Sequence, residues 1–239
     1  MTKKTLFLLF FLCVSLFYNT KKSARLDWDV FGYYLYLPAK FIYDDITLEK
    51  KDVWLDPLVT KYKTTEGFYQ AYKGPKDTYV MKYTMGLTYV YAPFFFIANI
   101  AAPVLGYEQD GFSPPYQWML LFGSVLFSLI GIWFLFKILT RYFSDSIVLI
   151  TISFLVFGSN YFVMTAYDGL MPHNFVFTFY AIMLYYTIKW HENQKLKYII
   201  GVRPHTISPQ YLAMMVKSIN DIDPDRVWIN FVAGFIRED

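Results

Sequence analysis

The fold is decided by residues 115–136, which read PYQWMLLFGSVLFSLIGIWFLF and contain no charged side chain. An α-helix rises about 1.5 Å per residue, so a helix over this run would cross the roughly 30 Å hydrocarbon core of a bilayer. Lys137 and Arg141 follow at its end. The run therefore predicts a transmembrane helix that ends at a basic interface.

Two further apolar runs follow it, residues 146–166 and residues 174–188, and both read as spans. The short loops alternate in charge, with acids at 108–110, bases at 137–141, an acid at 168 and lysines from 189. Cytoplasmic loops of membrane proteins are enriched in Lys and Arg. We therefore predict that 137–145 and 189–197 lie in the cytoplasm.

Residues 85–106 are also uncharged and long enough to span, yet the charge pattern argues against a crossing. If 21–84 lie outside and 85–106 cross, every later loop inverts and the positive-inside rule fails. We therefore predict that this segment lies at the outer interface or re-enters, helped by Gly86, Pro93 and Pro103. A plain span with a weak charge bias is the alternative.

The chain then divides into four predicted parts. Residues 1–20 form a transmembrane anchor helix, since the run after Met1–Lys4 lacks a clean cleavage site; a signal peptide is the alternative. Residues 21–115 form an extracytoplasmic loop containing the interfacial helix 85–106, and 116–203 hold transmembrane helices. Residues 204–239 are a tail too charged to insert, either cytoplasmic or the foreign end of a truncated chain. The expected fold class is an all-α polytopic membrane protein with a large loop after its first helix.

Composition supports this class and excludes others. The 239 residues are 56% hydrophobic and 22% aromatic, which is typical of an integral membrane protein. The net charge of +3 comes without a basic run, which argues against nucleic acid as a partner. A single cysteine, Cys13, excludes a disulfide within the chain. We find no phosphate-binding loop and no metal-ligand spacing, and therefore predict neither metal nor cofactor.

Two carboxylates stand out directly after the first apolar run. Asp27 and Asp29 flank Trp28 and precede Tyr33 and Tyr34. An apolar surround raises the energy of a charged carboxylate, so such groups near a membrane are either paired or functional. One of the two acids could act while the other anchors a basic neighbour. The alternative is a solvated loop start whose acids pair with nearby basic residues.

Three other residues are candidates for contact with a substrate. Lys82 precedes the apolar segment 85–106, where a point charge suits a lipid phosphate; an ordinary lysine reaching toward the interface is the alternative. Asp168 and His173 flank Met171-Pro172 at the outer end of a predicted span and could face a cavity. The alternative for these two is a short loop with a helix cap at Asn174.

This arrangement resembles the N-terminal portion of polytopic membrane glycosyltransferases of the GT-C class, which includes protein O-mannosyltransferases and lipid A aminoarabinose transferases. In that class one span precedes a large outer loop that opens with an acidic motif, often Asp-Glu followed by an aromatic residue. Asp29-Val30-Phe31-Gly32-Tyr33 stands in that place, with Asp29 matching the Asp and Val30 replacing the second acid. Asp27 is the nearest other acid.

The resemblance continues later in the loop and covers roughly residues 5–204. The class has a Lys or His followed by Pro-Pro-Leu, which opens an interfacial helix before the second span. Lys82-Tyr83-Thr84-Met85-Gly86 is similar to it but lacks the prolines, and residues 105–111 are similar to the turn after that helix. Members of the class have more spans, so a truncated arrangement is expected here.

The resemblance implies an enzyme of the bacterial inner membrane that takes a sugar from a polyprenyl-phosphate donor, with membrane lipid as its surroundings. Asp29 would be the general base and Lys82 would neutralise the leaving phosphate, while Trp28, Tyr33 and Tyr34 would stack on sugar faces. A non-catalytic scaffold or truncated remnant is one alternative. A transporter component is another, although the predicted spans carry no charge, which such a protein would need.

Overall fold

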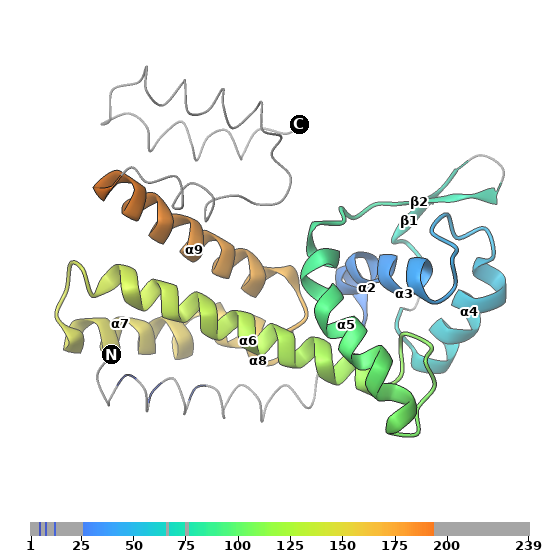
Figure 1. The fold of residues 1–239 in the computed structure, drawn as a ribbon, viewed down its shortest axis with the longest axis horizontal. Coiled ribbons are helices and arrows are strands. Elements are labelled where there is room, and N and C mark those ends of the chain that lie inside the picture. Colours follow the sequence, from blue (N-terminus) through green and yellow to red (C-terminus); the bar gives the residue numbers. More distant parts are fainter. Residues whose placement is uncertain are drawn as a thin grey trace, which may run out of the picture.

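A computed structural model of the protein describes residues 26–65, 67–74 and 77–193, together with Thr5, Leu8 and Leu12. These residues form an elongated helical bundle and, at one of its ends, a body of shorter elements (Figure 1). Most of the predicted anchor 1–20 lies outside the described residues. So does the whole predicted tail 204–239.

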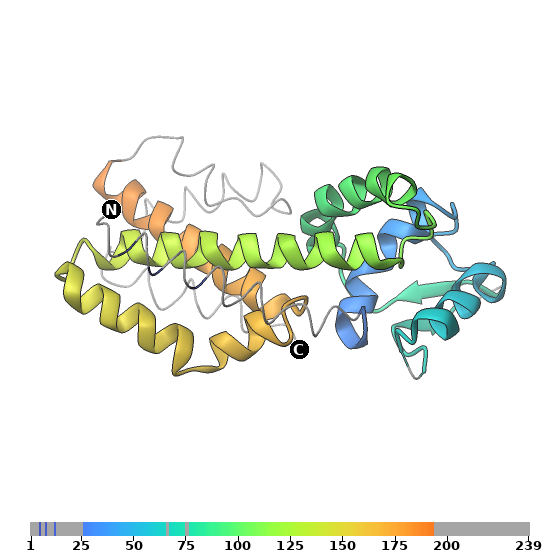
Figure 2. The same cartoon turned by 90° about the horizontal axis from the view of Figure 1, so that it is seen from below.

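The bundle is built on one long helix. α6 (Pro114–Leu139) begins with prolines in its first turn, where no backbone N–H is lost, and carries Lys137 in its last turn. α7 (Asp145–Phe157) and α8 (Asn160–Ala166) run back along it, and α9 (Pro172–Glu192) packs beside it (Figures 1 and 2).

The predicted span over 146–166 is broken in the structure. α7 and α8 meet at an angle of 62° across Gly158 and Ser159. The Ser159 hydroxyl accepts a hydrogen bond from the backbone N–H of Tyr161 and so caps α8. It also donates to the carbonyl of Leu155 in the last turns of α7. One side chain therefore satisfies backbone groups on both sides of the break.

Two helices, α6 and α5 (Gly86–Val104), are long and apolar enough to cross a membrane, and the bent α7–α8 pair would count as a third if it forms one span. With few strands, this confirms an all-α polytopic membrane protein.

The contact between α6 and α9 is a polar seam of small residues. Asn174 donates from Nδ2 to the hydroxyl oxygens of Ser124 and Ser128, at 2.6 and 3.1 Å. Gly131 follows on the same side of α6, and a Cβ added there would lie 2.5 Å from the Thr178 hydroxyl oxygen. Helices surrounded by lipid gain little from the hydrophobic effect, so close packing and interhelical hydrogen bonds hold them together.

The body at the end of the bundle contains six elements. Its antiparallel hairpin pairs Ala71 with Met81. The elements are α2 (Trp28–Tyr34), α3 (Tyr36–Phe41), α4 (Lys51–Tyr62), β1 (Ala71–Lys73), β2 (Tyr79–Met81) and α5.

An aromatic core joins this body to the start of α6. Phe31 and Tyr34 of α2, Phe95 of α5, Phe112 and Tyr116 are fully buried. The ring centroids of Tyr34 and Phe112 are 6.0 Å apart, and those of Phe95 and Tyr116 are 5.5 Å apart. Buried aromatic side chains remove large apolar areas from solvent, so this cluster is the main packing contact of the body.

Asp110 fastens the loop before α6 to the rest of the body. Its Oδ1 accepts hydrogen bonds from the backbone N–H groups of Phe112 and Ser113, at 2.8 and 2.7 Å. Its Oδ2 accepts one from the Tyr62 hydroxyl of α4 at 2.5 Å. Burial, together with this bond to Asp110, raises the pKa of Tyr62 to about 12, so the phenol stays a donor at physiological pH.

Both ends of α5 are attached to the same body. Near its start, the Thr88 hydroxyl donates to the carbonyl of Tyr33 at 2.7 Å. Just beyond its end, Glu108 pairs with Lys61 of α4 at 2.5 Å. α5 crosses α6 obliquely and does not extend along it to the end that carries Lys137 (Figures 1 and 2). Its exposed apolar residues are Tyr89, Phe96, Ile97, Ile100 and Val104.

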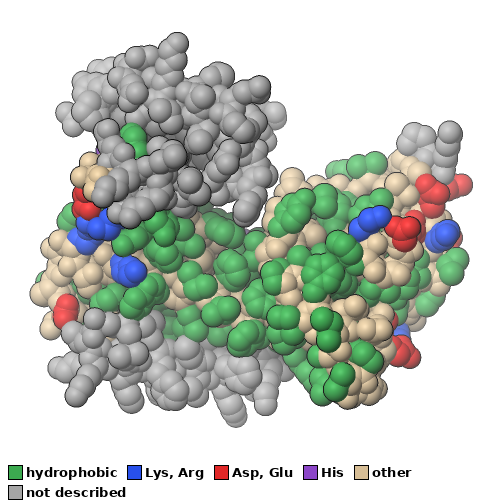
Figure 3. All heavy atoms as spheres, in the orientation of Figure 1, with side chains coloured by type: hydrophobic (Ala, Val, Ile, Leu, Met, Phe, Trp, Pro, Cys, Tyr) green, Lys and Arg blue, Asp and Glu red, His purple; other side chains and the backbone are tan. Residues whose placement is uncertain are grey.

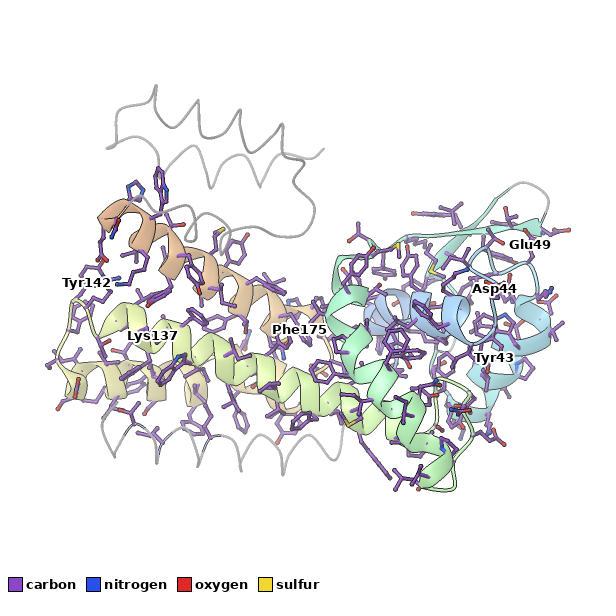
Figure 4. All side chains as sticks on the ribbon, viewed as in Figure 1. Tyr43, Asp44, Glu49, Lys137, Tyr142 and Phe175 are labelled. Carbon is purple, nitrogen blue, oxygen red and sulfur yellow. The ribbon has the colours of Figure 1, made fainter. Side chains whose placement is uncertain are left out.

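The two loops predicted to be cytoplasmic meet at the far end of the bundle. Arg141 after α6 pairs with Glu192 at the end of α9, and Lys189 pairs with the same carboxylate at 3.3 Å. Figure 4 shows Lys137 and Tyr142 at this end and Tyr43 in the body at the opposite end. The structure therefore brings the two basic loops to the same end of the bundle, as they must be if both lie on one side of the membrane. That this side is the cytoplasm stays a prediction.

We predict that Gly131→Val loosens the α6–α9 seam. The new side chain would overlap the Thr178 hydroxyl, which lies across a close helix contact. Overpacking of this kind typically costs on the order of 1–3 kcal/mol. Thermal unfolding in detergent micelles should show the loss. Gly86→Ala is the matched control, because a Cβ at Gly86 meets no atom within 4 Å; an equal effect of both changes would contradict this description of the seam.

We also predict that Asp110→Ala unfastens the body from the bundle. The change leaves two buried backbone N–H groups and the Tyr62 hydroxyl without their acceptor, at a cost on the order of 3 kcal/mol. Hydrogen exchange should then accelerate in 108–116 and in α4. Asp77→Ala, which removes an exposed carboxylate, is the control and should leave both segments unchanged.

Candidate functional site

The site is built around Asp29 in the first turn of α2. The helix starts abruptly, because Asp27 is extended and Trp28 adopts a left-handed backbone with φ of 49°. Gln70, fully buried, holds this start by donating from Nε2 to the Trp28 carbonyl at 3.1 Å. A left-handed non-glycine residue costs energy and persists where surrounding contacts impose it. The strain aims the half-buried Asp29 toward the hairpin.

Two tyrosines from the hairpin region donate hydrogen bonds to Asp29. Tyr83, after β2, donates to Oδ1 at 2.6 Å, and Tyr69, before β1, donates to the same oxygen at 3.3 Å. Within the described residues, no ion pair joins Asp29 to a cation. The basic residues that the alternative prediction paired with it, Lys22 and Arg25, lie outside the described residues.

Gly32 makes this contact possible. A Cβ at Gly32 would lie 2.1 Å from the Tyr83 ring, so only glycine lets that ring lie directly on α2. The Tyr33 ring packs against the Tyr83 ring, with centroids 4.8 Å apart, and the Tyr36 hydroxyl donates to the backbone carbonyl of Tyr83 at 2.5 Å. The packing of the Tyr83 ring therefore positions its hydroxyl to donate to Asp29.

The electrostatics of the site keep its phenols neutral. Burial, then the hydrogen bond to Asp29, raises the pKa of Tyr83 well above its ordinary value. Burial raises the pKa of Tyr69, and burial together with the nearby Asp29 raises that of Tyr33. Loss of a proton beside a carboxylate would bring two negative charges together. Tyr69 and Tyr83 therefore remain hydrogen-bond donors to Asp29 over the physiological range.

Lys82 contacts the ring of the same Tyr69. Its side chain is exposed, and its backbone N–H donates to the Gln70 carbonyl at 2.9 Å, which fixes its position at the end of β2. The ammonium lies 4.5 Å from the ring centroid of Tyr72 and 5.6 Å from that of Tyr69. Since the hydroxyl of the same Tyr69 binds Asp29, one phenol ring separates the predicted base from the predicted cation.

The other residues near Asp29 that were predicted to form the site differ in their solvent exposure. Trp28 is 67% exposed, and Tyr33 is partly exposed at the rim of the site. Asp27 is half-buried at the start of α2. Tyr34 was expected to stack on a sugar, but it is fully buried and donates its hydroxyl to the Gly111 carbonyl. A helical turn of 3.6 residues points it into the core, and it is not a surface for a ligand.

Asp168 lies on the turn between α8 and α9, His173 lies in the first turn of α9, and both are exposed. His173 lines an open cavity of about 400 Å³, whose other lining residues are Leu155, Ser159, Asn160, Tyr161, Met164, Asn174 and Phe177. Asp168 does not line it. The α8–α9 turn is tied to α5, since the Tyr91 hydroxyl donates to the Leu170 carbonyl at 2.6 Å.

This turn and α2 occupy neighbouring positions on α5. Thr88 binds the carbonyl of Tyr33, and Tyr91, three residues further on, binds that of Leu170. Residues three apart lie on the same face of a helix. α2 and the α8–α9 turn therefore contact one stripe of α5, which puts the two groups of predicted residues at the same end of the bundle.

Sequence reasoning missed four residues that shape the site, Gly32, Tyr69, Gln70 and Tyr83. The last three are distant from Asp29 in sequence and come close only through the hairpin. Tyr83 adjoins Lys82, which is the one local signal that could have indicated it. Among the described residues, no group of three or more His, Cys, Asp or Glu side chains could hold a metal ion.

We predict that Gly32→Ala destabilises the protein, although Ala is normally the better helix residue by roughly 0.5–1 kcal/mol. The reversal follows from the overlap of the new methyl group with the Tyr83 ring. Thermal unfolding would measure it, and Trp28 fluorescence would report movement beside Asp29. Gly32→Ala combined with Tyr83→Ala should recover most of the loss. A stabilising single change would contradict the packing described here.

Comparison with known proteins adds one match. Residues 113–205 match the model of a family described as dolichyl-phosphate-mannose-protein mannosyltransferase. No curated protein and no solved structure matches the chain. The matched segment begins at the N-cap of α6 and covers the α6–α9 bundle, whereas Asp29 and Lys82 precede it. The match confirms, over residues 113–205, the resemblance of this chain to membrane glycosyltransferases of the GT-C type.

Proposed function

We propose that the protein transfers a sugar from a polyprenyl-phosphate donor to an acceptor at the extracytoplasmic side of a bacterial inner membrane. The observation that carries the proposal is that Asp29 and Lys82 both contact Tyr69, Asp29 at its hydroxyl and Lys82 over its ring. The family match supports the class of reaction. The donor and the side of the membrane are parts of the proposal.

The body that holds Asp29 would lie outside the membrane. On α6, Trp118 and Lys137 are separated by roughly 28 Å of helix, close to the thickness of the hydrocarbon core. Aromatic residues and lysines mark the two interfaces of a span. α5 would then lie obliquely at the outer interface, because its two ends are both bound to one extramembrane body. Its exposed apolar side would face lipid.

Asp29 would act as the general base. The acceptor hydroxyl oxygen attacks the anomeric carbon of the donor sugar, and the bond from that carbon to the phosphate oxygen breaks. The acceptor proton passes to Asp29, and the polyprenyl phosphate leaves with the bonding electrons. Both tyrosines bind Oδ1 of Asp29, so Oδ2 is the oxygen that would receive the proton.

Lys82 would bind the phosphate of the donor. A leaving phosphate needs neutralisation of its charge more than it needs a proton. In the structure the Lys82 ammonium rests over the rings of Tyr72 and Tyr69, in a contact that is worth about 1 kcal/mol at an exposed site. A phosphate can replace that contact at little cost. Trp28 and Tyr33 would contact the sugar, and Asp168 and His173 would contact the acceptor or the donor from the α8–α9 turn.

We predict that Asp29→Asn lowers the rate of sugar transfer by about 10²–10⁴-fold, because an amide cannot take the acceptor proton. The assay would follow labelled sugar from a polyprenyl-phosphate donor in membranes that contain the protein. Donor retention should be unchanged. Asp77→Asn, a change at an exposed carboxylate on the hairpin, is the control. Transfer by Asp29→Asn at the normal rate would rule out this base.

Lys82→Ala should act on donor binding. The expected result is an increase of about tenfold in the donor concentration needed for half-maximal rate, since one charged contact to a phosphate is lost. Lys73→Ala, at an exposed lysine on the same hairpin, should have no effect. A loss of rate at saturating donor, with donor binding unchanged, would assign Lys82 a different role.

A further inference from the structure

A second cationic cluster lies at the end of the bundle opposite Asp29. Lys137 and Arg141 are one turn apart on α6 and the loop after it, and Lys189 approaches them from the end of α9. Figure 4 shows Lys137 at this end, and Figure 3 shows basic side chains there set into a largely hydrophobic surface. The proposed sugar transfer makes no use of these residues.

The cluster has more positive than negative charge. Glu192 is the carboxylate that Arg141 and Lys189 share. Lys137 has no ion-pair partner among the described residues, and its ammonium instead lies 5.2 Å from the ring centroid of Trp133 and 5.4 Å from that of Tyr185. A half-buried ammonium held by aromatic rings and left without an anion is a site where an anion would be stabilised.

The guanidinium of Arg141 has an unused donor. Its Nη2 binds Glu192, but its Nη1 is buried and has no acceptor in the part of the chain that the structure describes. A buried donor without an acceptor costs about 1–3 kcal/mol, and more for a charged group. An oxygen ligand placed between Arg141 and Lys137 would remove that cost and neutralise the free ammonium together.

The position of the cluster identifies the chemistry of the ligand. Lys137 lies where α6 would leave the hydrocarbon core, beside the ring of Trp133, so the site is at the level of lipid headgroups. Phosphate offers several oxygens to a guanidinium and accepts the point charge of a lysine. The polyprenyl donor is proposed to react at the opposite end of the bundle, which leaves the phospholipids of the near leaflet as the source.

We propose that Lys137 and Arg141 form a binding site for the headgroup phosphate of an anionic phospholipid, at the end of the α6–α9 pair that carries Glu192. Trp133 and Tyr185 flank the headgroup, and the acyl chains follow the apolar surface of the bundle. The site would bind one individual lipid molecule. A basic loop without such a site would instead attract a diffuse layer of anionic lipids. The phosphate site itself is argued from Lys137 and Arg141 alone, and only the choice of phospholipid over polyprenyl phosphate rests on the proposed sugar transfer.

Native mass spectrometry of the detergent-solubilised protein, titrated with phosphatidylglycerol or with phosphatidylcholine of the same acyl chains, tests the proposal. Wild type should retain phosphatidylglycerol at least tenfold more tightly. Lys137→Gln should lower that affinity about fivefold, and the double change Lys137→Gln, Arg141→Gln should remove the preference. Lys40→Gln with Lys73→Gln, which removes two exposed lysines of the opposite body, is the charge-matched control and should change nothing.

The double change also removes one of the two partners of Glu192, so a second variant guards against a loss of fold. Lys137→Arg keeps the charge and should keep the preference for phosphatidylglycerol. Equal retention of the two lipids by wild type would overturn the proposal, as would an undiminished preference in the double variant. Binding of polyprenyl phosphate at this cluster in preference to phosphatidylglycerol would overturn the choice of ligand.

Discussion

The half of this protein that carries Asp29 depends on an aromatic core that joins α2, α5 and the start of α6 into one body. Phe31, Tyr34, Phe95, Phe112 and Tyr116 are fully buried in it. Because α5 is packed against this core and bonded to the body near both ends, it cannot leave its two ends on opposite sides of a membrane while the core stays intact. The position of Asp29 follows from the same core, since α2 contributes its buried face to it.

The bundle and the body are stabilised by different kinds of contact. Between α6 and α9 the contact is made by small residues and interhelical hydrogen bonds from Asn174, which are effective where lipid surrounds the helices. In the body the contact is apolar burial with an ionic fastening at Asp110. The site lies on the body, where tyrosine hydroxyls reach a carboxylate and a lysine is accessible. In our proposal the bundle holds that body at the membrane surface and binds a lipid at its other end.

Much of the fold could be predicted from sequence, because apolar runs and loop charges are local signals. Residues 115–136 and 174–188 lie within α6 and α9. The break at Gly158 and Ser159 was not predicted, because residues 146–166 carry no charge and were read as one continuous span. α4 was not predicted either, because its apolar residues follow no clear period and Pro57 lies within it.

The candidate site could be predicted only in part. Asp29 and Lys82 were found from their places beside apolar segments, and the structure separates them by one tyrosine ring. The partners Tyr69, Gln70 and Tyr83 depend on a hairpin that brings distant residues together, which no local pattern encodes. The prediction that Tyr34 contacts a sugar is wrong, because a run of aromatic residues does not reveal which of them faces the core. Its complete burial and its bond to Gly111 settle that point.

The placement of α5 on one side of the membrane can be tested by labelling its two ends. Single cysteines at Thr84 and Gln109, each in a Cys13→Ser background, would be labelled in intact cells with a membrane-impermeant thiol reagent, with Ser144→Cys as the opposite-side reference. These three positions are exposed. We expect Thr84→Cys and Gln109→Cys both to be labelled from outside and Ser144→Cys to be labelled only after permeabilisation. Labelling of the two α5 ends from opposite sides would contradict this placement.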